Sequence, residues 1–330
     1  HHAAFRETQK TGALDSLGLT AVATRDVPTV ARHELDTPRI GLVHTWTNTQ
    51  DEGWVRYTFD RLHIPYTYLS TQQLRDSTKL AGVDVLVFPN SGRDSRALVT
   101  GLPMAGPPVP WKRTAETPSL GGIDSTDDVR PGIGIEGLAR LDTWVRRGGL
   151  LITEGGTVSI PVQSGFGRAV SIVEARQLRA RGAVFRSQIQ DSQSPIAYGY
   201  ADTLPVYFNQ APLLQVDSMS SRGTEQARDS TVIRDMWRTQ PRVVVRFHSR
   251  ADSLGISGLL EGGSELAGRP AVVDVPHGNG HVVLFAIRPF WRWETQGSFA
   301  LAFNAILNWN DLGTSWPTAA PRRMRQTTGL

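Results

Sequence analysis

The sequence contains no cysteine among its 330 residues. This absence excludes disulfide bonds, catalysis by a thiolate and zinc sites that use cysteine ligands. It does not decide the cellular compartment, because exported proteins can also lack cysteine. The sequence also has no apolar run long enough to cross a bilayer, so we expect no membrane span.

The sequence has little excess of charge of either sign. Lys and Arg number 35 and Asp and Glu 31, a net charge of +4, and the basic residues are scattered along the chain. So small a surplus does not favour nucleic-acid binding. No signal peptide and no internal repeat are visible. The opening HHAAFRET lacks an initial Met, and we expect it to be an added tag or the trimmed end of something longer.

What the sequence does contain, from residue 38 onward, is an alternation of apolar strands and amphipathic helices. Strands are predicted at 39–45, 66–70, 83–89 and 149–154, with a helix that Asp51 and Glu52 open and that ends before Pro65. Residues 72–80 are predicted to be helical as well. This order is typical of a parallel sheet with right-handed crossovers. We therefore predict an α/β fold of the flavodoxin-like kind, with helices on both faces.

The stretch from Gly134 to Thr157 is the clearest single unit of this pattern. Its helix places Ile135, Leu138, Leu141, Trp144 and Val145 on one apolar stripe, which is predicted to face the sheet. A continuous apolar strand follows and ends at Glu154, before two glycines. The carboxyl end of such a strand is where an open α/β sheet places its chemistry.

The second half of the sequence is richer in strands. Strands are predicted at 183–189, 205–208, 213–216 and 243–248, and a hairpin is predicted around Gly278-Asn279-Gly280. An amphipathic helix capped by Ser298 is predicted to run to Leu312. Residues 90–132 are predicted to be irregular, and 11–24 to hold a short helix. The predicted organisation is a linker or extension over 1–37, one α/β domain with a β-rich insertion over 38–312, and a tail over 313–330.

Four stretches together resemble a known family. They are PRIGLVHTWTNTQDEGWVRYTFD, the turn DSQSPIAYG, the run SGLLEGGSELAGRPAVVDVPHGNGHVVLFAIRP and the closing QGSFALAFNAIL. They are similar to the cysteine-less, class I glutamine-amidotransferase-like domain at the C-terminal end of large bacterial zinc carboxypeptidase-like proteins. The resemblance covers about residues 38–312.

The resemblance implies a non-catalytic accessory domain that binds a ligand or scaffolds an upstream catalytic domain. It also implies a periplasmic or secreted location and no cofactor. The metallopeptidase zinc ligands are absent, because no HxxE pair with a distant His is present. In amidotransferase-like sheets a cysteine nucleophile stands at the strained turn that follows such a strand. Here Glu154 or its neighbour stands there.

Three catalytic alternatives remain open from the residues themselves. His277 and His281 are four apart, but a hairpin separates them, which disfavours a shared zinc ion. Ser159 follows the Gly155-Gly156 turn and is a candidate nucleophile with His44 as its base. Glu52 and Glu154 are candidates for an acid–base pair if they approach closely. These alternatives describe a cysteine-free hydrolase; the sequence favours structural roles for the same residues.

A binding crevice is the prediction that the sequence favours. Aromatic and Arg side chains follow the last strand, in the segment Phe290–Trp293, and suit a sugar or peptide ligand, an interface with a neighbouring domain, or ordinary packing. A free-standing sugar- or peptide-binding protein is therefore a further alternative. The predicted crevice residues come from the carboxyl ends of four strands, and they are His44, Trp46, Glu52, Asn90, Glu154, Arg288 and Arg292.

Overall fold

The computed structural model describes residues 25, 34–217 and 240–313. Every element named below belongs to the unit 35–330. The helix predicted at 11–24 and the residues from 314 onward lie outside the described residues. The predicted domain boundaries at 37 and 312 therefore remain predictions. Among the described residues, no helix combines the length and the apolar character that crossing a membrane would require.

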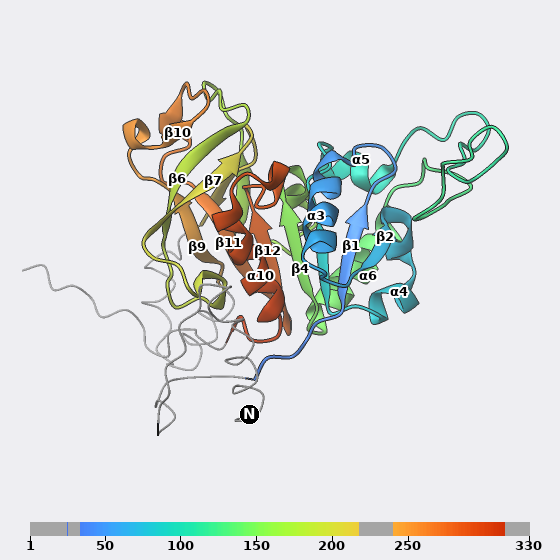
Figure 1. Cartoon of the computed structure of the whole chain (residues 1–330), viewed down its shortest axis with the longest axis horizontal. Coiled ribbons are helices and arrows are strands. Elements are labelled where there is room, and N and C mark those ends of the chain that lie inside the picture. The colour runs from blue at the N-terminus through green and yellow to red at the C-terminus, as the bar shows by residue number, and fades with distance from the viewer. Residues whose placement is uncertain (1–24, 26–33, 218–239, 314–330) are drawn as a thin grey trace, which may run out of the picture. The chain divides into compact units, whose positions relative to one another are not determined.

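The first half of the sheet is parallel and has the predicted flavodoxin-like order β2-β1-β3-β4-β12 (Figure 1). All four predicted strands are confirmed, as β1 (Ile40–His44), β2 (Thr67–Ser70), β3 (Val85–Phe88) and β4 (Leu150–Glu154). The fifth parallel strand is β12 (Gly280–Phe285), which pairs with β4. β1, β3 and β4 are buried along their whole length, as expected of strands covered on both faces.

The strands of the second half extend this same sheet in the antiparallel sense. After β12 the order continues β11-β9-β6-β10, and β7 also pairs with β6, which gives a ten-stranded sheet within the described residues. The predicted β-rich insertion is therefore present, but most of it continues the main sheet. The bounds are β6 (Ala183–Ile189), β7 (Thr203–Phe208), β9 (Arg242–Phe247), β10 (Gly255–Ser257) and β11 (Pro270–His277). A separate pair consists of β5 (Val170–Val173) and β8 (Leu213–Val216).

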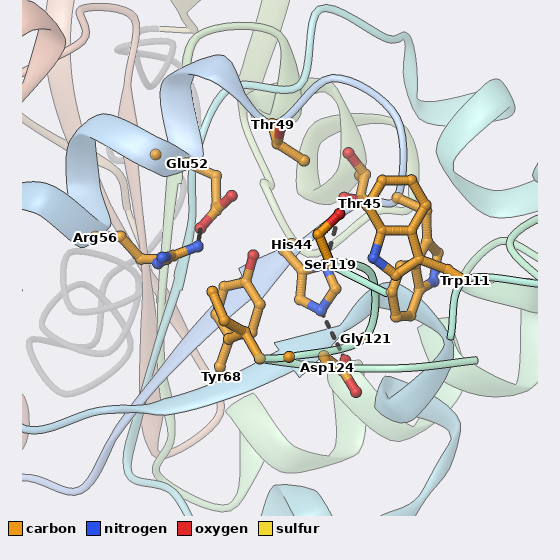
Figure 2. Close-up of a pocket in the computed structure, with 14 residues that line it drawn as sticks. His44, Thr45, Thr49, Glu52, Arg56, Tyr68, Trp111, Ser119, Gly121 and Asp124 are labelled. Carbon is orange, nitrogen blue, oxygen red and sulfur yellow. Dashed lines mark hydrogen bonds and ion pairs between the residues drawn. The ribbon is translucent and has the colours of Figure 1, made fainter. Parts of the chain in front are cut away.

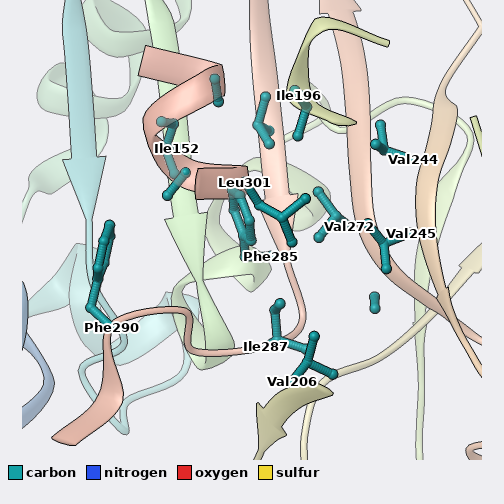
Figure 3. Packing of buried hydrophobic residues seen from close by; sticks show 14 of the residues in the cluster. Ile152, Ile196, Val206, Val244, Val245, Val272, Phe285, Ile287, Phe290 and Leu301 are labelled. Atoms are coloured by element: carbon teal, nitrogen blue, oxygen red, sulfur yellow. The ribbon is translucent and has the colours of Figure 1, made fainter. Parts of the chain in front are cut away.

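Helices cover both faces of the sheet, and each face has its own apolar core. The helices are α3 (Gln50–Arg61), α4 (Ser77–Ala81), α5 (Ser95–Thr100), α6 (Gly134–Arg146), α7 (Ser159–Gln163) and α10 (Phe299–Leu307). Side chains of α3 and α10 join one core, and those of α4, α5, α6 and α7 join the other. Figure 3 shows the first core, where Leu301 of α10 lies by Phe285 of β12 and Ile152 of β4. Burying each such side chain contributes about 1.5–3 kcal/mol.

Short 3-10 helices connect many of these elements. They are η1 (Thr71–Arg75), η2 (Gly155–Val158), η3 (Pro195–Ala197), η4 (Ala251–Ser253), η5 (Gly263–Glu265), η6 (Trp291–Trp293) and η7 (Gln296–Ser298). The helix predicted at 72–80 is in fact η1 followed by α4. The break falls at Asp76, whose carboxylate accepts a hydrogen bond from the Thr78 amide and caps α4.

Three further sequence predictions are wrong in detail. α6 begins at Gly134, so Ile135 lies in its first turn and is 81% exposed, whereas Leu141 and Val145 are buried as predicted. The 90–132 region, predicted to be irregular, contains α5. The last helix ends at Leu307, and Ser298 provides no side-chain cap because its hydroxyl donates to carbonyl groups of Thr295 and Pro289.

Candidate functional site

A cavity of about 320 Å³ lies at the carboxyl end of β1. It is enclosed by the end of β1, the first turns of α3, Tyr68 of β2 and the loop 101–132, which extends from the sheet in Figure 1. We name it the His44 cavity (Figure 2). Its lining residues are His44, Thr45, Trp46, Thr49, Glu52, Gly53, Arg56, Tyr68, Trp111, Ser119, Gly121, Gly122, Ile123 and Asp124.

His44 links the first strand to the long loop. Its Nε2 lies 2.8 Å from Oδ2 of Asp124, and its Nδ1 lies 3.3 Å from the carbonyl oxygen of Thr45. The ring stacks on Tyr68 with 4.1 Å between centroids. Burial lowers the pKa of His44, although its hydrogen bond to Asp124 acts in the opposite direction. Because a carboxylate only accepts hydrogen bonds, Nε2 of His44 donates to Asp124, and this bond holds the loop beside the cavity.

Glu52 is the buried carboxyl of the cavity. Its Oε1 has no hydrogen-bond partner, and the nearest cation is Nη1 of Arg56, one helical turn further on, at 3.7 Å. Burial raises the pKa of Glu52, while the Tyr68 hydroxyl and Arg56 lower it. Figure 2 shows Glu52 and Tyr68 directed toward each other across the cavity. Oε1 of Glu52 therefore accepts no hydrogen bond and has only the longer ion pair with Arg56.

Two indoles form the aromatic side of the cavity. Trp46 and Trp111 lie 6.4 Å apart between ring centroids with an angle of 50° between their planes. Nε1 of Trp46 is buried and lacks a hydrogen-bond partner, and Trp111 is 38% exposed. Trp111 is fixed by two backbone hydrogen bonds with Thr126 across the loop.

A second polar group, which we name the Asp51 cluster, consists of Asp51, Asn90, Glu154 and Arg288. Asn90 donates from Nδ2 to Oδ2 of Asp51 at 3.0 Å, and Nη1 of Arg288 lies 3.2 Å from Oδ1 of Asp51. Asn90 Oδ1 accepts a hydrogen bond from the Gly156 amide at 2.8 Å. Burial, and secondarily the charge of Asp51, raises the pKa of Glu154 well above its usual range, while Arg288 acts in the opposite direction.

Neighbouring residues of α3 thus serve different groups. Asp51 and Glu52 are successive in the first turn of the helix, where side chains are about 100° apart around the axis. Asp51 takes part in the Asp51 cluster and Glu52 lines the His44 cavity. The predicted Glu52–Glu154 pair is replaced by a different one, because the carboxylate whose charge acts on Glu154 is Asp51.

The turn after β4 holds no nucleophile. Glu154 is the last extended residue, and Gly155 follows it with a positive φ of 56°. A Cβ on Gly155 would lie only 2.8 Å from Oδ1 of Asn90. The strained position of the turn is therefore occupied by the neighbour of Glu154, a residue without a side chain.

The other catalytic alternatives find little support in the described side chains. The hydroxyl of Ser159 donates to the carbonyl of Gly156 at 2.7 Å, and the His44 nitrogens face Asp124 and Thr45. His277 and His281 contact different carboxylates, those of Asp142 and Asp274. Within the described part of the chain, no group of three or more potential metal ligands comes together.

The seven predicted crevice residues fall into separate places. His44, Trp46 and Glu52 line the His44 cavity, and Asn90, Glu154 and Arg288 belong to the Asp51 cluster. Arg292 is exposed, and its guanidinium lies 5.4 Å from the ring centroid of Trp291. The segment around it serves packing, since Phe290 is buried against Phe59, Phe299 and Phe303.

Sequence reasoning missed most residues of these two groups, among them Asp51, Arg56, Tyr68, Trp111 and Asp124. Two of them had a usable signal. Tyr68 stands in β2, the strand next to β1, and Arg56 lies one helical turn after Glu52. Trp111 and Asp124 stand in an irregular loop, where no periodicity places a side chain.

Comparison with known proteins adds similarities of fold. No family model and no curated protein matches the sequence. A putative ThuA-like protein from Bacteroides uniformis is 9% identical with a TM-score of 0.45, over 84% of this chain and 94% of that one. A putative GMP synthase protein from Thermoplasma acidophilum is 12% identical with a TM-score of 0.43, over 83% and 94%. A β-galactosidase from Bacillus circulans sp. alkalophilus is 10% identical with a TM-score of 0.45, over 82% of this chain and 30% of that one.

The TM-scores of these three solved structures all lie below 0.5, so the similarities are too weak to assign a fold or a role to the chain. The α/β class of the chain is defined by the strand order and the helices of the structure. Identities of 9–12% carry no information about the roles of individual residues.

Proposed function

We propose that this domain binds a small polar ligand in the His44 cavity and carries out no chemistry at the turn after β4. The observation behind the proposal is a cavity whose buried wall contains polar atoms without partners. Leaving such an atom unpaired costs about 1–3 kcal/mol, so a site of this kind is stabilised by a ligand that satisfies it. A volume of about 320 Å³ suits a small molecule.

The absence of a side chain at Gly155 supports the non-catalytic half of this proposal. A retained fold with a lost nucleophile can still bind a ligand, since function belongs to sites rather than to folds. The Asp51 cluster stabilises the turn at that position, because Asn90 accepts from the Gly156 amide and is itself bound to Asp51.

We propose also that this binding serves a catalytic hydrolase, upstream in the same protein or separate, in the periplasm or outside the cell. The support for this part is the sequence resemblance to accessory domains of zinc carboxypeptidase-like proteins. Co-purification of the chain with a metallopeptidase domain from its native source would support it, and its recovery free of any such domain would contradict it.

The binding proposal is tested with a library of small polar compounds, using the indole N–H resonances of the protein as the readout. We expect compounds that shift the resonances of Trp46 and Trp111, with affinities weakened about tenfold or more by Glu52→Gln. The exposed Glu136 of α6 provides a matched control, and Glu136→Gln should leave binding unchanged. Equal binding by the two variants, or no bound compound at all, would contradict the proposal.

A further inference from the structure

The His44 cavity presents both donors and acceptors to its ligand. Oε1 of Glu52 is an acceptor without a partner, and Nε1 of Trp46 and Nε of Arg56 are buried donors without partners. All three residues line the cavity. A ligand that satisfies all three must accept two hydrogen bonds and donate one. Hydroxyl groups do both, because each oxygen donates once and accepts twice.

The charges of the cavity already have partners within the chain. Arg56 faces Glu52 at 3.7 Å, and Asp124 accepts a hydrogen bond from His44 at 2.8 Å. A zwitterionic dipeptide would bring two full charges into a partly buried site that offers no free countercharge, which is costly. The ligand class that fits is therefore neutral.

The aromatic side of the cavity consists of two partly exposed indoles. Trp111 is 38% exposed, and its plane is tilted by 50° from that of Trp46. Two tilted indoles do not form the parallel slot that a planar base would enter. One exposed indole suits a ring whose own face is made of C–H groups, because that contact removes apolar surface from water.

From these observations we infer that the His44 cavity binds a neutral pyranose, a monosaccharide or the terminal unit of a short saccharide. Trp111 contacts the C–H face of the sugar. The hydroxyl groups of the sugar form hydrogen bonds with Glu52, Arg56 and Trp46. This inference rests on the proposed function and specifies its ligand; a volume of about 320 Å³ also limits the ligand to one or two rings.

The test titrates the full chain with the methyl pyranosides of glucose, galactose and mannose, and with glycyl-glycine, alanyl-alanine and adenosine. We expect at least one pyranoside to bind, and Trp111→Ala and Glu52→Gln each to weaken it about tenfold or more. Trp111→Phe, which keeps a ring, should recover part of that loss. Tyr198→Ala and Glu136→Gln alter an exposed aromatic and an exposed carboxyl outside the cavity and should bind as the unchanged chain does.

Each other outcome has a distinct meaning. If a dipeptide or adenosine binds with the same dependence on Trp111 and Glu52 while no pyranoside does, the sugar inference is overturned and the proposed function stands. Pyranoside binding that ignores these substitutions overturns the inference as well. If no probe and no compound of the library binds, both the sugar inference and the proposed ligand-binding function are wrong. Thermal unfolding of each variant shows whether a loss of binding reflects a loss of the fold.

Discussion

Glu154 places a carboxyl group in the interior at the end of a buried strand. It is 2% exposed, and its Oε1 has no hydrogen-bond partner. Its nearest described charges are those of Asp51 and Arg288, which act on it in opposite directions. Burial is the largest of these effects, and it raises the pKa of Glu154 by disfavouring the charged form. The Asp51 carboxyl has a raised pKa for the same main reason, although Arg288 and Asn90 lower it.

A carboxyl group whose pKa is raised in the folded state makes the folded state less stable as the pH rises. The contribution of Glu154 to the free energy of unfolding is fully present below the pKa of the unfolded chain, near 4.5. It is lost as the pH rises through the higher pKa of the folded state. Gln does not ionise, so the variant Glu154→Gln should not lose this stability as the pH rises. Its free energy of unfolding, relative to that of the unchanged chain, should therefore increase with pH. The growth is up to about 1.4 kcal/mol per pH unit within that window.

Urea unfolding at a series of pH values from 4 to 8 measures this difference. Glu136→Gln, at an exposed carboxyl of α6, is the matched control for the loss of one carboxylate. A constant offset between Glu154→Gln and the unchanged chain over the whole range would show that Glu154 ionises with equal ease in both states. That result would remove the basis for a buried acid in the Asp51 cluster.

At the scale of elements, the loop 101–132 depends on a few side-chain anchors. Arg130 is buried, its guanidinium donates to both oxygens of Asp128, and it also donates to the carbonyl groups of Ala105 and Gly106. The Arg130 guanidinium holds the pKa of Asp128 far below its usual range. The hydrogen bond between Asp124 and His44 also holds the loop, to the end of β1. These contacts replace the regular backbone hydrogen bonds that a helix or strand would supply.

Removing the Asp128 charge should loosen this loop. We expect Asp128→Asn to increase the rate of tryptic cleavage after Lys112 and Arg113 several-fold, because cleavage requires local opening of the loop. Asp252→Asn is the matched control: Asp252 is exposed, lies outside the loop and forms with Arg250 a surface ion pair of the kind that contributes little. Equal cleavage rates for both variants would mean that Arg130 is held well enough by its carbonyl partners alone.

Some of the helices, strands and turns could be predicted from the sequence, and others could not. Strands buried on both faces, such as Leu150–Glu154, gave apolar runs that fixed their type and order, and the hairpin at Gly278-Asn279-Gly280 followed from its turn residues. The break of 72–80 into η1 and α4 depends on capping by Asp76, which apolar periodicity does not report. Loop residues such as Trp111 and Asp124 reach the cavity through tertiary contacts, and no local pattern carries that information.

At the scale of the whole molecule, one sheet edge carries two polar groups with different roles. The end of β1 and the start of α3 contribute to the His44 cavity, and the ends of β3 and β4 contribute to the Asp51 cluster. α3 joins them, because its first turn supplies Asp51 to one and Glu52 to the other. Both groups contain buried polar atoms without hydrogen-bond partners, but only the residues of the His44 cavity line a ligand-sized space. The Asp51 cluster instead fixes the turn after β4. The proposed ligand site and the cluster that supports the turn therefore both use side chains of α3.

This division predicts that the chain alone shows no turnover of glutamine, peptides or esters. The turn that would present a nucleophile holds Gly155, and the hydroxyl of Ser159 donates to a backbone carbonyl instead of to a base. Ammonia release from glutamine and cleavage of chromogenic esters and peptides are to be measured with the unchanged chain, Glu154→Gln and Ser159→Ala. We expect background rates for all three. Turnover by the unchanged chain that either substitution abolishes would establish a cysteine-free hydrolase, and binding in the His44 cavity would then be the first step of catalysis.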